Sequence, residues 1–134
     1  MQFKKKLRRA AERHREDANT LFENNRWDNA GYHFGLSAEC AFKAALEAAG
    51  FSTVDIKVDG REKDAYWEHF PALKRVSIAY TGRVSLNVTQ TLTKSNFLQY
   101  WTVEMRYAQD TVDKAQCLKW KQDVEAFLNQ CLAV

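Results

Sequence analysis

Apolar residues recur at the spacing of an α-helix along the first fifty residues of the chain. The first run predicts a helix over about residues 4–24, because its members return to one face every three or four positions. This run consists of Leu7, Ala11, His14, Ala18 and Leu21. Asn24 and Asn25 follow it, and both tolerate the left-handed conformation that ends helices. We therefore expect the helix to stop there.

A second apolar run predicts a helix over about residues 27–49, ended by Gly50. Its main stripe contains Trp27, Ala30, Phe34, Ser37, Ala41, Ala44 and Ala48, and small residues also lie beside that stripe. Small side chains allow neighbouring helices to approach closely. We expect this second helix to be the most buried element of the protein.

The middle of the chain has a mixed pattern. Alternating apolar residues between positions 51 and 67, with the turn signal Asp59-Gly60, indicate a short hairpin or an ordered loop. Pro71 suits the start of a third helix, expected to run to about Tyr80. Alternation at Val84, Leu86 and Val88 indicates a second short extended piece.

Two further helices are predicted in the last third. Ser95 is a plausible cap for a short helix that carries Phe97, Leu98, Trp101 and Met105. A final helix, capped by Asp110 or Thr111, should continue to about Leu132. With one proline and five glycines in 134 residues, long helices are favoured. The expected fold is all-α: a single domain, residues 1–134, forming an antiparallel bundle of four to five helices.

Composition narrows the class of protein. No apolar run reaches the ~18 residues that a membrane span needs, and the basic start is not followed by the apolar segment of a secretory signal. We therefore expect a cytoplasmic protein without a membrane partner. The three cysteines, Cys40, Cys117 and Cys131, are an odd number without a C-x-x-C pair, and the histidines are scattered. No disulfide framework, metal site or cofactor is expected.

The net charge of +3 is unevenly distributed. Residues 1–16 carry seven basic side chains against two acidic ones. Such a cluster either attracts the phosphates of RNA or a nucleotide, or is a solvated helix face, and the sequence weighs the two equally. The candidate nucleic-acid-binding residues in this stretch are Lys4, Lys5, Lys6, Arg8 and Arg9.

The order and spacing of several short motifs resemble the HEPN family of prokaryotic helical domains. The matching segments are Arg15-Glu16-Asp17-Ala18, Arg26-Trp27-Asp28-Asn29-Ala30, Ser37-Ala38-Glu39-Cys40-Ala41-Phe42-Lys43-Ala44-Ala45-Leu46, His69-Phe70-Pro71-Ala72-Leu73 and Glu104-Met105-Arg106-Tyr107. The resemblance implies a helical bundle that is often dimeric. It also implies toxin–antitoxin or phage-defence systems, in which many members accompany a small nucleotidyltransferase.

Toxic members of that family are metal-independent ribonucleases with an Arg-x4-6-His motif at the start of the last helix. Here no histidine follows Arg106 within that window, and the next residue is the aromatic Tyr107. The chain is similar to the R-Y branch of the family, and the departure puts ribonuclease activity in doubt. If catalysis occurs, its candidate residues are Arg106, His69 and Tyr107.

Arg106 has two interpretations. It could be an exposed phosphate-binding cation beside a stacking Tyr107, or it could pair with Glu39 inside the bundle. The second interpretation is favoured, because a buried glutamate needs a partner. It makes Glu39, Lys43 and Arg106 a structural polar cluster.

Two classes of function follow. The leading hypothesis is a binding module that acts through dimerisation, through a cognate protein such as a nucleotidyltransferase, or through binding of RNA or a nucleotide. The alternative is a metal-independent endoribonuclease with a composite site around Arg106.

Overall fold

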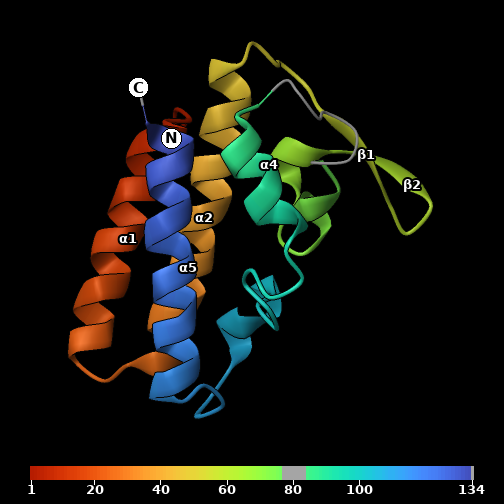
Figure 1. Cartoon of the computed structure of the whole chain (residues 1–134). Helices are drawn as coiled ribbons and strands as arrows, with labels where there is room; N and C mark the ends of the chain where they lie inside the picture. The colour runs from red at the N-terminus through yellow and green to blue at the C-terminus, as the bar shows by residue number, and fades with distance from the viewer. Residues whose placement is uncertain (77–83, 134) are drawn as a thin grey trace.

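Three long helices lie side by side and form the body of the protein (Figure 1). They are α1 (Leu7–Glu23), α2 (Trp27–Ala48) and α5 (Lys114–Leu132). The computed structural model describes residues 1–76 and 84–133. In this part of the chain the fold is mainly helical and contains a small two-stranded sheet, which confirms the expected helical class.

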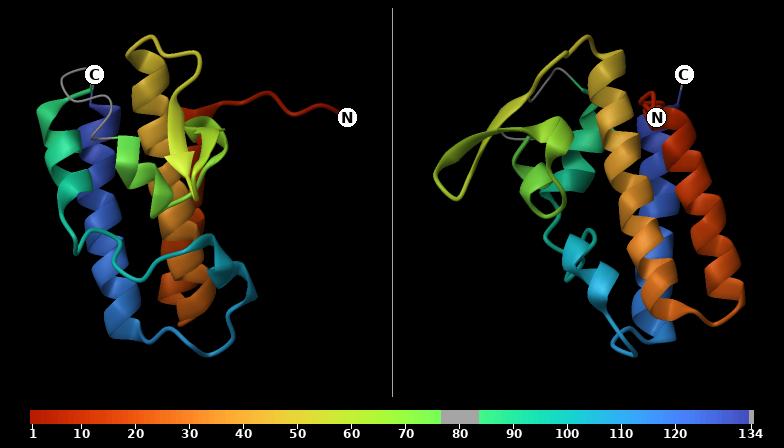
Figure 2. Two further views of the ribbon diagram at one scale, coloured as in Figure 1. Left: turned by 90° about the vertical axis from the view of Figure 1, so that its right-hand side faces the viewer. Right: turned by 180° about the vertical axis from the view of Figure 1, so that it is seen from behind.

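The direction of the helices differs in part from a fully antiparallel bundle. α1 and α2 are antiparallel because a tight turn joins them, with Asn25 in the left-handed conformation at φ 61°. α5 runs in the same direction as α2, because the connection before it returns along the length of the bundle (Figures 1 and 2).

Helix α2 is the centre of the core, as its small and apolar residues predict. Its buried residues include Ala30, Phe34, Ala38, Ala41, Phe42 and Leu46. Gly31 and Gly35 leave room for aromatic rings from later segments: a Cβ at Gly35 would lie 1.8 Å from Cε2 of Trp101. The Trp101 indole nitrogen also donates a hydrogen bond of 2.8 Å to the Gly31 carbonyl. The expected close approach to α2 is therefore made by tryptophans as well as by helices.

The segment after α2 forms the predicted short hairpin. Strands β1 (Asp55–Val58) and β2 (Arg61–Asp64) pair antiparallel, with Val58 opposite Arg61. Asp59 and Gly60 have φ values of 52° and 76°, as a two-residue turn with two left-handed positions requires. The hairpin projects from one side of the helical body (Figure 2).

The segment around the predicted third helix is less regular than expected. Two 3-10 turns, η1 (Ala65–Trp67) and η2 (Ala72–Arg75), flank Pro71. The α-helical conformation begins only at Val76. The rest of the predicted helix, to Tyr80, lies outside the described residues.

Two predictions for the following segment were wrong. Residues 86–88, expected to be extended, belong to helix α4 (Leu86–Thr93). Their alternation is misleading because Val88 and Leu92, four residues apart, form the buried face of a helix. The short helix expected after Ser95 is instead a set of turns followed by the 3-10 helix η3 (Val103–Tyr107).

The start of the last helix also differs. Asp113, rather than Asp110 or Thr111, caps α5 by accepting a hydrogen bond of 2.8 Å from the Gln116 backbone nitrogen. The backbone nitrogens of Thr111 and Val112 donate instead to Asp28 at the start of α2. This contact attaches the entry of α5 to the entry of α2.

Candidate functional site

A buried carboxylate on α2 holds the segment that precedes Pro71. Glu39 is only 2% exposed, and its two oxygens have separate partners. His69 Nδ1 lies 2.8 Å from Oε1, and the Phe70 backbone nitrogen donates to Oε2 at 2.8 Å. The His69 side chain remains 42% exposed. Glu39 thus fixes one ring nitrogen of His69, and the other side of the ring is accessible.

Lys43 lies one helical turn beyond Glu39 and is almost completely buried, with 9% of its surface exposed. Burial lowers the pKa of Lys43 from its ordinary value, while Glu39 acts in the opposite direction. Lys5 and Glu68 also act on this ammonium, Lys5 lowering and Glu68 raising its pKa. Charges from α2, the N-terminal segment and the loop after η1 therefore converge around Lys43.

The N-terminal segment contacts an exposed aromatic ring beside this cluster. The Lys5 ammonium lies 4.0 Å from the centroid of the Trp67 ring, and Trp67 is 70% exposed. A cation over a tryptophan face is held by the quadrupole of the ring. This contact places the basic segment next to the residues that precede His69.

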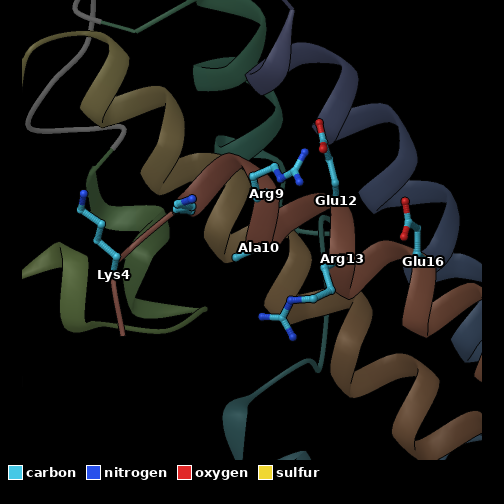
Figure 3. Close-up of a pocket in the computed structure, with 7 residues that line it drawn as sticks. Lys4, Arg9, Ala10, Glu12, Arg13 and Glu16 are labelled. Atoms are coloured by element: carbon cyan, nitrogen blue, oxygen red, sulfur yellow. The ribbon is translucent and has the colours of Figure 1, made fainter. Parts of the chain in front are cut away.

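The same basic segment continues onto α1. A hollow of about 520 Å³ is lined by Lys4, Lys6, Arg9, Ala10, Glu12, Arg13 and Glu16. Arg9 and Arg13 come from successive turns of α1, and Lys4 precedes the helix (Figure 3). Arg8, by contrast, lies 3.6 Å from Glu12 in an ion pair and does not line the hollow. Four of the basic candidates, Lys4, Lys5, Lys6 and Arg9, therefore lie in one region together with Arg13, and Arg8 is partly neutralised by Glu12.

The expected pairing of Arg106 with Glu39 is wrong. Glu39 is already satisfied by His69 and the Phe70 backbone, and Arg106 is exposed, with its guanidinium 4.9 Å from the Tyr107 ring. Tyr107 is itself 72% exposed. The structural polar cluster therefore has His69 in the place expected for Arg106. The backbone N–H of Phe70 and the imidazole of His69 occupy both oxygens of Glu39, so this carboxylate needs no buried arginine as a partner.

Arg106 and His69 are also not brought together. The residue before Arg106, Met105, packs near Gly31, whereas His69 contacts Glu39, eight residues further along α2. At 1.5 Å per residue, these levels are about 12 Å apart along the helix axis. The two catalytic candidates thus belong to different parts of the surface.

The other two histidines form a pair that their sequence separation concealed. His14 on α1 and His33 on α2 have their Nδ1 atoms 3.1 Å apart, so one imidazole donates a hydrogen bond to the other. Burial, Arg13 and His33 lower the pKa of His14 to about 4, and burial also lowers that of His33. The described residues contain no group of three or more His, Cys, Asp or Glu side chains suited to a metal ion.

The thiols are free, as expected. Burial raises the pKa of Cys117 to about 12, and it also raises the pKa values of Cys40 and Cys131. Thiols held in the protonated form are poor nucleophiles. In the described part of the chain no helix is both long and apolar enough to cross a membrane.

Trp67 is the residue of this region that sequence reasoning missed. An isolated tryptophan two positions before a histidine carries no recognisable signal. Its role depends on η1, which presents the ring to solvent, and on Lys5, more than sixty residues earlier in the chain.

Comparisons with known proteins do not assign a family. No protein-family model matches the chain, and no curated protein or solved structure gives a significant match.

Proposed function

We propose that this protein is a binding module for single-stranded RNA. The observation that carries the proposal is the Lys5–Trp67 contact, which joins an exposed aromatic ring to a continuous basic surface. We define the RNA surface as Lys4, Lys5, Lys6, Arg9, Arg13 and Trp67. Surfaces of this kind bind single strands by attracting phosphates to cations and stacking bases on aromatic faces.

The arrangement favours a single strand over a duplex. Trp67 offers a face on which one unstacked base can lie, and bases inside a duplex do not present such a face. The neighbouring cations lie on an extended segment and on one helix, so they follow a line along which a backbone can run (Figure 3). Glu12 and Glu16 limit the basic surface on the side of α1 nearer to α5 (Figure 3).

The experiment is calorimetric titration of the full chain with a short oligouridylate at several salt concentrations. Binding should weaken linearly on a log–log plot, with a slope of about 0.7 for each neutralised phosphate. Replacing Lys4, Lys5 and Lys6 together by Gln should reduce that slope by about 2. Trp67→Ala should weaken binding by roughly 1–3 kcal/mol, as expected for the loss of one stacked base.

Arg106 provides the matched control, because it and Tyr107 form a second exposed cation–aromatic pair away from the RNA surface. Arg106→Ala should affect the affinity less than the loss of Trp67. If Arg106→Ala abolishes binding and the lysine variant does not, the RNA surface lies around Arg106 and Tyr107 instead.

A second candidate function, a metal-independent endoribonuclease, is favoured by one observation. Glu39 orients His69 through Nδ1, and a histidine held in this way is suited to general acid–base chemistry. The separation of His69 from Arg106 removes the partner that would stabilise the phosphorane charge. We therefore expect little or no cleavage of RNA in EDTA. Clear cleavage, abolished by His69→Ala and by Arg106→Ala in folded proteins, would establish the enzyme.

We also propose a biological setting for the module, based on the resemblance of its sequence to HEPN domains. That resemblance supports a bacterial toxin–antitoxin or phage-defence system with a cognate protein, such as a nucleotidyltransferase. Co-purification of the tagged chain with the product of a neighbouring gene would test this, and the absence of any stable complex would count against it.

A further inference from the structure

The hairpin carries two cations on the face that it turns towards the body of the protein. Side chains directly opposite each other in paired strands lie on the same face of the sheet. The register therefore places Arg61 beside Val58 and Lys63 beside Ile56. Ile56 is only 5% exposed, so this face is the inner one, yet Arg61 and Lys63 are both exposed. β2 thus presents charge where the inner face of a sheet usually has apolar side chains.

These two cations line a hollow together with two carboxylates. The hollow measures about 500 Å³ and is lined by Val58, Asp59, Arg61, Lys63 and Glu68. Glu68 belongs to the loop after η1 and is partly buried, whereas the other four residues come from the hairpin. The hollow therefore lies between the inner face of the hairpin and the loop that follows Trp67.

The opposite charges in this hollow do not pair with each other. In the described part of the chain, no ion pair includes Arg61 or Lys63, and none includes Asp59 or Glu68. Both cationic donors and carboxylate acceptors are thus open to a ligand that lies between them.

We propose that this hollow binds a guanine base of single-stranded RNA. Guanine presents two adjacent acceptors, O6 and N7, which a guanidinium contacts with two hydrogen bonds. Arg61 is their partner, and Lys63 is a second donor. Guanine also presents two adjacent donors, N1–H and N2–H, which match the two oxygens of the Glu68 carboxylate. The other three RNA bases lack this pair of donors.

This inference deepens the proposed function and rests on it, because it assigns a base preference to the bound RNA. Glu68 directly follows Trp67 in the chain, so the hollow adjoins the RNA surface. The bases of a single strand are unpaired, and their edges are accessible to side chains. A strand with one base on Trp67 therefore has further bases available for the hollow.

The test is calorimetric titration of the full chain with hexauridylate and with the same strand carrying one central guanosine, adenosine or inosine. Guanosine should strengthen binding about tenfold, whereas adenosine should not. Inosine lacks N2–H and should keep only part of the preference. Glu68→Gln and Arg61→Gln should each remove most of the guanosine preference, and either variant tests the site if the other fails to fold.

The opposite face of the same hairpin supplies matched controls. Glu62→Gln and Lys57→Gln make the same changes of charge, but these two residues are paired on the outer face and do not line the hollow. Both variants should keep the guanosine preference. If they reduce it as much as Glu68→Gln and Arg61→Gln do, the preference arises from the overall charge of the hairpin and the guanine site is overturned.

The two proposals can fail separately. Equal affinity of the parent protein for all four strands overturns the guanine site but leaves RNA binding intact. Binding of GMP, lost in Glu68→Gln, with no affinity for any strand overturns RNA binding and supports the site. Glycine is the probe for a different ligand class, because a free amino acid also carries both charges. Binding of glycine, lost in Glu68→Gln, without a guanosine preference would assign the hollow to amino acids instead.

Discussion

Glu39 shows how one side chain connects the core with the candidate site. Its carboxylate is buried in α2, yet it determines the position of the backbone before Pro71 and of the His69 ring. The conformation of the site therefore depends on the same interaction that holds this segment on the bundle. Changes at Glu39 should affect both stability and ligand binding.

Glu39→Leu should lower the free energy of unfolding by about 1–3 kcal/mol, because it leaves the buried Phe70 nitrogen without an acceptor. Urea denaturation monitored by circular dichroism measures the change. The matched control is Glu68→Gln, a partly exposed carboxylate that accepts none of these bonds, expected to stay within about 0.5 kcal/mol. If the two substitutions change the free energy of unfolding equally, the hydrogen bond from the Phe70 nitrogen to Glu39 does not stabilise the fold.

The His14–His33 pair should make stability dependent on pH. The pKa of His14 is about 4 in the folded protein and near 6.5 when it is unfolded, so the unfolded chain binds more protons between these values. Stability must then rise with pH across this window and fall on acidification from about 6.5 towards 4. Arg13 opposes protonation of the pair and Asp17 favours it.

Melting temperatures at pH 7 and pH 5 check this expectation. His14→Phe removes the titrating group and should lose less stability between the two pH values than the parent protein. His69→Phe serves as the comparison, since it removes a histidine that is not part of the pair. If the parent protein is equally stable at pH 7 and pH 5, the lowered pKa of His14 does not contribute to its stability.

At the scale of elements, local signals predicted the helices better than the segments between them. α1 and α2 start and end within about three residues of the expected positions, because Asn25 and Gly50 adopt the left-handed conformations that end helices. The hairpin followed from Asp59-Gly60. The segment from Ser95 to Tyr107 was predicted to contain a helix and is irregular instead. Its Trp101 indole nitrogen donates a hydrogen bond to the Gly31 carbonyl on α2, and this long-range contact cannot be predicted from local sequence spacing.

The candidate site was predictable only in part for the same reason. The sequence identified Glu39, Lys43 and His69 as noteworthy, but it assigned Glu39 the wrong partner. Helical spacing relates residues within one helix, whereas the choice between His69 and Arg106 depends on where an irregular connection crosses α2. No local pattern contains that information.

Helix α2 provides a test of packing, since Ala41 is fully buried and Ala45, one turn later, is partly exposed. Ala41→Leu should overpack the core and cost about 1–3 kcal/mol in the free energy of unfolding. Ala45→Leu should cost less, because this position is partly exposed and the longer side chain can extend towards solvent. Thermal melts of both variants measure the difference, and an unchanged melting temperature for Ala41→Leu would show that α2 is not tightly surrounded.

For the whole molecule, large apolar side chains on the surface favour association. Among the described residues Trp67, Leu86, Tyr100 and Tyr107 are each at least 66% exposed. We predict a homodimer at micromolar concentration, or a heteromer with a cognate protein, because burial of such side chains is favourable. Sedimentation velocity distinguishes monomer from dimer. Tyr100→Lys together with Tyr107→Lys should dissociate a dimer that uses this region, whereas Leu118→Lys should not. A parent protein that sediments only as a monomer would contradict the homodimer.

The exposure of Trp67 has a spectroscopic consequence. Trp101 and Trp120 are buried and Trp27 is partly buried, so Trp67 is the one indole of the four that lies mainly in solvent. Iodide should quench its fluorescence first, and the anion should be drawn to it by the ammonium of Lys5. A base stacked on this ring would shield it. The unmodified chain therefore contains its own optical reporter, positioned where the proposed ligands would bind.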